Sequence, residues 1–184
     1  MLCRPDLAVD VVVGGSASNA EQVRTRISDW PQARFFRQVD TMAELMAAAD
    51  LAIGAGGSTS WERCCLGLPS ITVCVADNQR AVVERLGDVG ASVNLGDAAN
   101  VSAADLAAAI RTLLAAPGLC RSLSERSGEM CDGRGAARVA RSLRLDAGGL
   151  DAEVRIHPHG ARRIGEDQII ERVTVGIGGK RFRG

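Results

Sequence analysis

The stretch between residues 50 and 79 restricts the fold of this chain more than any other part of the sequence. Within it, an apolar segment at residues 51–53 runs into three glycines within positions 54–57 and then into a helical pattern. A second apolar segment, residues 71–75, ends in the polar run Asp-Asn-Gln at 77–79. A strand, a glycine-rich turn, a helix and a second strand predict one unit of a parallel sheet. Such sheets bind ligands beyond the carboxyl ends of their strands.

The turn after the first of these strands has the residue types of a phosphate site. Gly57 lets the backbone approach a ligand without a Cβ in the way, and hydroxyl donors follow beside the free N–H groups of the helix start. These donors are Ser58, Thr59 and Ser60. Asn78 and Gln79 leave the neighbouring strand at the same edge of the sheet, where their amides would reach a diphosphate or a sugar. The sequence therefore predicts a nucleotide-diphosphate site.

Several of these residues also have an interpretation as helix caps. Thr59 and Glu62 have the spacing of a capping box, in which two side chains satisfy backbone N–H groups of the first turn. One turn into the helix, Glu62 is also placed to accept the two hydroxyls of a ribose. Asp77 and Asn78 favour the cap position of the helix that follows them. Both interpretations stay open from the sequence.

Two further loops are candidate contacts at the same edge. A strand expected at residues 9–14 ends in a glycine turn, in which Gly15 would approach a ligand. Glycine turns after strands are also ordinary structural features, so this turn has both interpretations. Val39 ends a short strand expected at 33–39, and Met42 lies just beyond it. They offer an apolar slot for a nucleotide base, or else they pack in the core.

The remaining elements alternate between strand and helix. A further strand is expected at 91–95, and helices are expected at 19–30, 42–49, 59–66, 78–86, 103–114 and, with an interruption near 132–135, 119–143. The helix expected at 103–114 should be stopped by the Pro-Gly pair at residues 117–118. Apolar strands separated by helices predict an α/β fold, a Rossmann-like parallel sheet with helices on both faces. We expect this domain to occupy residues 1–146.

The C-terminal segment differs from the rest. From about residue 147 to residue 184 the helical period is lost, and we expect an irregular tail without an assigned role. Residues 154–156 and 169–175 have the composition of short strands, and the last residues read as disordered. The two histidines, His157 and His159, both lie in this segment.

Composition excludes several functions. A net charge of zero argues against a nucleic-acid partner held by bulk electrostatics. No run of 18 or more apolar residues is present, so no membrane span is expected, and the first residues lack the pattern of a signal peptide, which favours a cytoplasmic protein. The six cysteines show no Cys-x-x-Cys spacing and lie far from the histidines. We expect buried reduced thiols, no zinc site and no cofactor.

The run GAGGSTSWERCCLGLP at residues 54–69, followed by ADNQ at 76–79, resembles the C-terminal half of the UDP-sugar hydrolases of pseudaminic acid biosynthesis. These hydrolases release UDP from UDP-2,4-diacetamido-2,4,6-trideoxy-β-L-altrose. They are related to the GT-B glycosyltransferase that adds N-acetylglucosamine in peptidoglycan synthesis. The resemblance extends from about residue 9 to residue 143. It implies that the sheet is the C-terminal domain of a GT-B fold and that the ligand is UDP or a UDP-sugar.

The resemblance also implies roles for individual residues. Ser58, Thr59 and Ser60 would hold the diphosphate beside Gly57 and Gly15, Glu62 the ribose, the backbone near Val39 the uracil, and Asn78 and Gln79 the phosphate and sugar, with Asn78 in a supporting catalytic role. Water would attack the anomeric carbon and expel UDP, and fixed donors would stabilise the charge on the leaving diphosphate without a metal.

In that family the general base is a histidine of an N-terminal domain, which has no counterpart in this sequence. The chain is therefore expected to be the nucleotide-binding half of such a hydrolase. It would be completed by an N-terminal-domain chain in trans, or would self-associate through residues 119–143. Two alternatives remain: a non-catalytic UDP-binding module or vestigial fragment, and the C-terminal domain of a GT-B glycosyltransferase.

Overall fold

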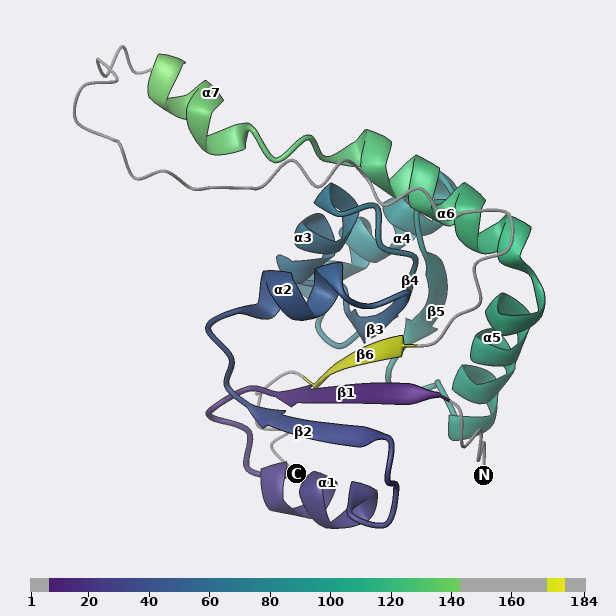
Figure 1. The fold of residues 1–184 in the computed structure, drawn as a ribbon. Coiled ribbons are helices and arrows are strands. Elements are labelled where there is room, and N and C mark those ends of the chain that lie inside the picture. Colours follow the sequence, from purple (N-terminus) through teal and green to yellow (C-terminus); the bar gives the residue numbers. More distant parts are fainter. Residues whose placement is uncertain (1–6, 143–171, 178–184) are drawn as a thin grey trace.

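The computed structural model describes residues 7–142 and 172–177, and its centre is a sheet of six strands (Figure 1). The strands are β1 (Ala8–Val13), β2 (Ala33–Arg37), β3 (Leu51–Ala55), β4 (Ser70–Cys74), β5 (Val93–Asp97) and β6 (Arg172–Ile177). They lie in the order β2-β1-β6-β3-β4-β5, and every neighbouring pair is parallel. The parallel α/β sheet expected from the sequence is therefore confirmed.

Helices connect successive strands, as a parallel sheet requires. They are α1 (Ala20–Ile27), α2 (Met42–Ala47), α3 (Thr59–Cys65), α4 (Arg80–Asp88), α5 (Ala103–Ala115), α6 (Pro117–Met130) and α7 (Gly135–Ser142), with a 3-10 turn, η1 (Asp77–Gln79), before α4. As expected, α5 ends before Pro117, but this proline is also the first residue of α6. Proline is tolerated there because the first N–H groups of a helix have no intrahelical partner.

Different helices cover the two faces of the sheet. On one face, alternate side chains of β1, β3 and β6 form the main core with α1, α5 and α6. Buried members of this core include Val9, Val11, Val13, Leu51, Ile53, Val173, Leu113 and Leu123. On the other face, Met46 and Ala52 belong to a smaller cluster under α2, and Cys64 packs with Leu86 between α3 and α4. Helices on both faces bury both sets of alternating strand side chains.

The central strand β6 comes from the C-terminal part of the chain. It pairs along its whole length with β1 and over residues 51–53 with β3 (Figure 1). The strand expected at 169–175 thus forms slightly later, at Arg172–Ile177. It lies beyond the domain boundary expected at residue 146, so the sheet includes part of the C-terminal segment. The strand expected at 154–156 and the last residues lie outside the described residues.

One buried carboxylate links β1 to the edge strand β2. Asp10 is 1% exposed, and its two oxygens accept hydrogen bonds of 2.7 and 2.8 Å from Nε and Nη2 of Arg34. The two residues are register partners, and the hydrogen bond to Asp10 is the main cause that raises the pKa of Arg34. A guanidinium fork fits a carboxylate in this two-point manner, which gives the pair both strength and geometric specificity.

The described cysteines are free thiols. Cys64, Cys74 and Cys120 are buried, as expected, whereas Cys65 and Cys131 are partly exposed. Burial raises the pKa of Cys64 and of Cys120 to about 11, so both thiols stay protonated at neutral pH and behave as small apolar side chains. Cys3 lies outside the described residues.

The last helices of the described chain lead away from the sheet. α6 ends at Met130 and α7 begins at Gly135, which confirms the expected interruption. α7 extends away from the sheet (Figure 1), and Val139 on it is 59% exposed. Within residues 7–142, no single helix is both long and apolar enough to cross a membrane. The pair formed by α5 and the α6–α7 segment meets that test by length and composition only, with a bend of 98°.

Candidate functional site

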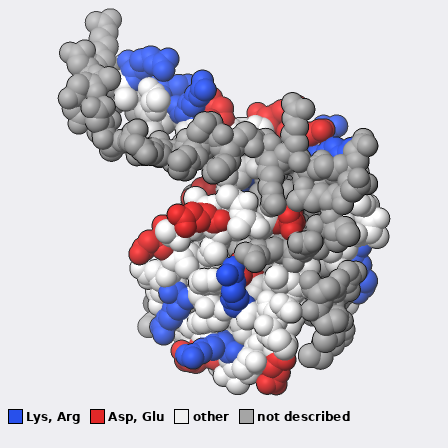
Figure 2. Space-filling view, in the orientation of Figure 1, with Lys and Arg blue, Asp and Glu red and all other residues white. Residues whose placement is uncertain are grey.

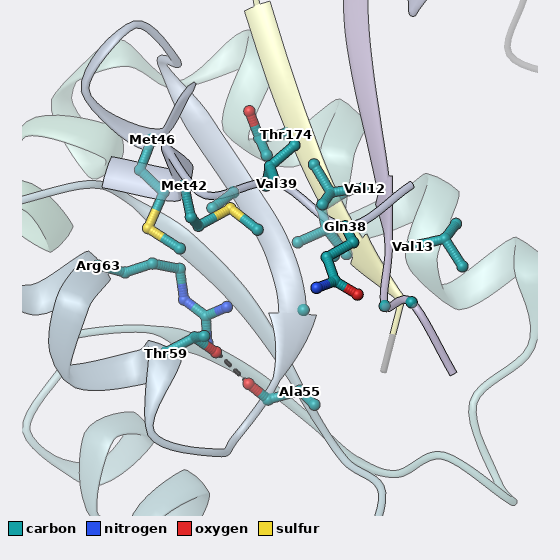
Figure 3. Close-up of a pocket in the computed structure, with 16 residues that line it drawn as sticks. Val12, Val13, Gln38, Val39, Met42, Met46, Ala55, Thr59, Arg63 and Thr174 are labelled. Atoms are coloured by element: carbon teal, nitrogen blue, oxygen red, sulfur yellow. Dashed lines mark hydrogen bonds between the residues drawn. The ribbon is translucent and has the colours of Figure 1, made fainter. Parts of the chain in front are cut away.

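A pocket of about 290 Å³ opens at the carboxyl ends of β1, β6 and β3, the edge at which the sequence predicts a ligand (Figure 3). Small residues of the sheet leave this space. Ala52 in β3 pairs with Thr174 in β6, and Gly54 lies near the backbone of Gly176. The other walls come from the end of β1, the loop after β2, and helices α2 and α3. The pocket therefore depends on elements that are far apart in the sequence.

Several residues expected to meet a ligand come together at this pocket. Gly15 follows β1, Val39 follows β2 and Thr59 begins α3, yet all three line the same cavity. Met42 lines it as well, next to Met46, and Figure 3 shows both methionine side chains extending from α2. Met42 also packs against the small core cluster under α2, so it contributes both to the expected slot and to core packing.

Four other candidate residues belong to the start of α3 and do not line the pocket. Ser60 is 1% exposed, and its hydroxyl oxygen accepts a hydrogen bond of 2.9 Å from Nη2 of Arg63. Ser58 and Glu62 are exposed to solvent, and Gly57 is half-buried. Their roles toward a ligand stay predictions.

The two amide residues of η1 lie close to the same turn. Asn78 is exposed. The side-chain oxygen of Gln79 accepts a hydrogen bond of 3.4 Å from the N–H of Val75, and a Cβ on Gly57 would lie 3.6 Å from its amide nitrogen. The end of β4 therefore packs beside the glycine turn, as the order of the strands predicts. The contacts of Asn78 and Gln79 with a ligand stay predictions.

The interpretation of Thr59 and Glu62, and of Asp77 and Asn78, as helix caps is wrong. Ser58 is the N-cap residue of α3, and no side-chain hydrogen bond closes that end, so Thr59 and Glu62 form no capping box. η1 and α4 also begin without a side-chain cap. Asp77 instead pairs with Arg80 at 3.4 Å. Thr59 and Glu62 are therefore not engaged in satisfying the helix start.

The loop after β2 contains a residue that the sequence analysis missed. Gln38 has a φ of 53°, in the left-handed region, which costs a non-glycine residue roughly 1 kcal/mol. Its N–H donates to the carbonyl oxygen of Val13 at 2.9 Å. Its side-chain oxygen lies so close over Gly15 that a Cβ there would collide with it. Residues held in such conformations gather at functional sites, and no local pattern in the sequence indicates this one.

A buried guanidinium is the second group that the sequence analysis missed. Arg63 in α3 is 4% exposed, and its Nη2 donates to the carbonyl oxygen of Ala55 at 2.8 Å and to Ser60. Figure 3 shows it in the pocket wall beside Thr59. Burial is the main cause that lowers the pKa of Arg63. The one sequence signal was its position one turn after Ser60, on the same side of the helix.

The described pocket residues supply no acid or base. Among the described residues that line the cavity there is no histidine, aspartate or glutamate. Within the described ranges, no three His, Cys, Asp or Glu side chains are grouped so that they could hold a metal ion, and both histidines lie outside those ranges. The arrangement combines an apolar slot, two glycine turns and one cation, which suits binding of a ligand.

Comparisons with known proteins place the fold. Residues 4–127 match the glycosyltransferase family 28 C-terminal domain. The spore coat polysaccharide biosynthesis protein SpsG of Bacillus subtilis (strain 168) is 33% identical over 132 residues, which cover 72% of this chain and 39% of that protein. The UDP-N-acetylglucosamine--N-acetylmuramyl-(pentapeptide) pyrophosphoryl-undecaprenol N-acetylglucosamine transferase of Sorangium cellulosum (strain So ce56) is 37% identical over 119 residues, or 61% of this chain and 29% of that enzyme.

A solved structure agrees with this placement. The glycotransferase of kitacinnamycin superposes with a TM-score of 0.54 at 20% identity, over 74% of this chain and 43% of that one. The described sheet thus has the Rossmann-like fold of a GT-B C-terminal domain, although β6 lies outside the residues that match the family. The chain spans 39% and 29% of the lengths of the two relatives.

Proposed function

Because this chain belongs to the glycosyltransferase family 28 C-terminal domain family, we propose that it binds the nucleotide part of a nucleotide sugar, UDP or a UDP-sugar, in the pocket at the ends of β1, β6 and β3. The observation that carries this proposal is the convergence of Gly15, Val39 and Thr59 on one cavity. A largely apolar cavity with a few directed polar groups is the usual form of a small-ligand site.

Each part of UDP has a proposed place. The uracil lies against Val39 and the methionines of α2, and the diphosphate lies between the glycine turn at Gly15 and the hydroxyl of Thr59. Gly57, Ser58 and Ser60 are proposed to shape the turn that holds the diphosphate. The ribose is proposed to extend toward Glu62, which is exposed and makes no capping box.

Titration calorimetry of the 184-residue chain with UDP tests the proposal. Val39→Glu places a carboxylate in the apolar slot and near the diphosphate, and we expect it to weaken UDP binding by at least about tenfold. Val139→Glu adds the same charge on α7, where the side chain is 59% exposed, and should leave the affinity unchanged. In the same titrations, Glu62→Ala should weaken UDP more than 2′-deoxy-UDP. The absence of binding at millimolar UDP would contradict the proposal.

The reaction is proposed in two forms. The motifs at 54–69 and 76–79 favour hydrolysis of UDP-2,4-diacetamido-2,4,6-trideoxy-β-L-altrose, with water as the acceptor and Asn78 in a supporting role. The second candidate is glycosyl transfer, which is favoured by the similarity to the Sorangium cellulosum N-acetylglucosamine transferase. In both forms the described pocket provides the nucleotide contacts. The general base is proposed to come from another domain or chain, since no described lining residue can act as one.

An assay of UDP release separates these proposals from a purely binding module. The chain alone, incubated with the UDP-sugar, is expected to release UDP no faster than buffer, because the described pocket contains no acid or base. Addition of an N-terminal GT-B domain in trans should produce UDP release above that of buffer. Release that depends only on water would identify a hydrolase, whereas release that requires a sugar acceptor would identify a transferase. Efficient turnover by the chain alone would contradict the proposal that the general base comes from another domain or chain.

A further inference from the structure

The pocket wall contains a buried positive charge whose hydrogen bonds are incomplete. In Arg63, Nη2 makes two hydrogen bonds, to the carbonyl oxygen of Ala55 and to the hydroxyl of Ser60. The buried Nε has no hydrogen-bond partner among the described residues. Both acceptors are neutral oxygens, so within the described residues no hydrogen-bonded carboxylate balances the charge of this guanidinium.

Such an arrangement is costly unless a further partner is present. Transfer of a charged group out of water is unfavourable unless the group is paired and hydrogen-bonded. The contacts of Nη2, together with the hydroxyl of Ser60, tie α3 to the end of β3. Among the described residues, Nε takes part in none of these contacts.

The surroundings of Arg63 leave space for an anion. A Cβ on Gly54 would lie 2.6 Å from Nη1, so the guanidinium rests directly against the floor of the pocket. Thr174 lines the same cavity, and its buried Oγ1 likewise has no hydrogen-bond partner in the part of the chain that the structure describes. On the face drawn in Figure 2, acidic and basic side chains are interspersed.

We propose that Arg63 is the cation that binds a phosphoryl group inside this pocket. The inference rests on the proposed function, in which the ligand is a nucleoside diphosphate, and it adds the residue that neutralises the diphosphate. The planar fork of a guanidinium matches two oxygens of a phosphoryl group, which a single ammonium group does not. Thr174 of β6 lines the same cavity (Figure 3).

The test compares three ligands on the whole chain: UDP, inorganic pyrophosphate and uridine. Arg63→Met removes the charge and keeps much of the apolar stem, and it is expected to weaken UDP and pyrophosphate by at least about tenfold while uridine changes by less than about twofold. Arg63→Lys keeps the charge but loses the fork, and intermediate losses are expected. The matched control is Arg26→Met, which removes an exposed arginine of α1 and should change none of the affinities.

A second variant covers the case in which Arg63→Met fails to fold. Gly54→Ala displaces the guanidinium, and the flexible end of that side chain can move without rearrangement of the backbone. This variant is expected to fold, as judged by circular dichroism, and to bind pyrophosphate at least about fivefold more weakly. Unchanged pyrophosphate and UDP affinities in the folded variants would overturn the inference and leave Arg63 as a structural residue.

The three ligands also separate this inference from the proposed function. If UDP binds and Arg63→Met has no effect, the phosphoryl contact is wrong and the nucleotide site stands. If the chain binds pyrophosphate in an Arg63-dependent way but UDP no better than pyrophosphate, the anion site stands and the nucleotide assignment fails.

Discussion

Replacement of Val173 by aspartate is expected to abolish or nearly abolish the cooperative folding of this chain. Val173 is 2% exposed and pairs with Val9 of β1 and Leu51 of β3 in the centre of the sheet. An ionised carboxylate there would be buried in the main core without a partner. The loss should exceed about 4 kcal/mol, which approaches the whole stability of many domains.

The effect reaches the pocket because β6 forms part of it. Thr174 and Gly176, which lie on the opposite face of β6 from Val173, line the cavity. Displacement of β6 would separate β1 from β3 and open the pocket. Any remaining folded Val173→Asp protein should therefore bind UDP more weakly than the wild type.

Thermal unfolding followed by circular dichroism measures this effect. A fall in Tm of at least roughly 10 °C, or loss of the transition, is expected. Val139→Asp is the matched control, since Val139 is 59% exposed on α7, and it should alter stability by no more than about 0.5 kcal/mol. Equal Tm values for the wild type and Val173→Asp would contradict the placement of β6 between β1 and β3.

The second large effect is expected at the buried carboxylate of β1. Arg34→Met removes the partner of Asp10, which is 1% exposed and accepts two hydrogen bonds from Arg34. Loss of one member of a buried pair leaves an uncompensated charge and typically costs 3–5 kcal/mol. The Arg34 side chain is 52% exposed, so water can partly replace it, and we expect a loss near the lower limit, about 3 kcal/mol.

Two further variants make this expectation specific. Arg37→Met changes a residue of the same strand. Arg37 is 53% exposed, and its ion pair with Glu21, which is itself 71% exposed, is as long as 4.0 Å. Its loss should cost less than about 1 kcal/mol. The double variant Asp10→Leu/Arg34→Met should recover much of the loss, because it removes the unpaired charge together with its partner. Urea unfolding of the wild type and the three variants gives the free energies of unfolding. Equal losses for Arg34→Met and Arg37→Met would refute the special role of the Asp10–Arg34 pair.

Elements with a strong local pattern were predicted closely. The strands expected at 9–14 and 71–75 form at Ala8–Val13 and Ser70–Cys74, because continuous apolar runs bounded by glycine or proline are typical of strands buried on both faces. The strand expected at 91–95 begins later, at Val93. The N–H groups of Ala91 and Ser92 both donate to the carbonyl oxygen of Leu86, at 2.8 and 3.2 Å, which holds these residues to the end of α4.

The meeting of candidate residues at one cavity was predicted where chain order and strand geometry agree. Gly15, Val39 and Thr59 could be named in advance because parallel strands bring their carboxyl ends to one edge of the sheet. Gln38 and Arg63 could not. The conformation of Gln38 depends on a hydrogen bond to Val13 in another strand, and the burial of Arg63 depends on how α3 packs against β3.

The sequence alone determined the alternation of strands and helices and the edge of the sheet at which the candidate residues meet, because both follow from residue patterns over a few turns or strands. Only the tertiary structure decided that a strand from residues 172–177 fills the centre of the sheet. Only it revealed that a cation is buried in the pocket wall. Strand pairing across more than a hundred residues and the burial of one side chain depend on contacts between distant parts of the chain, and no local pattern specifies them.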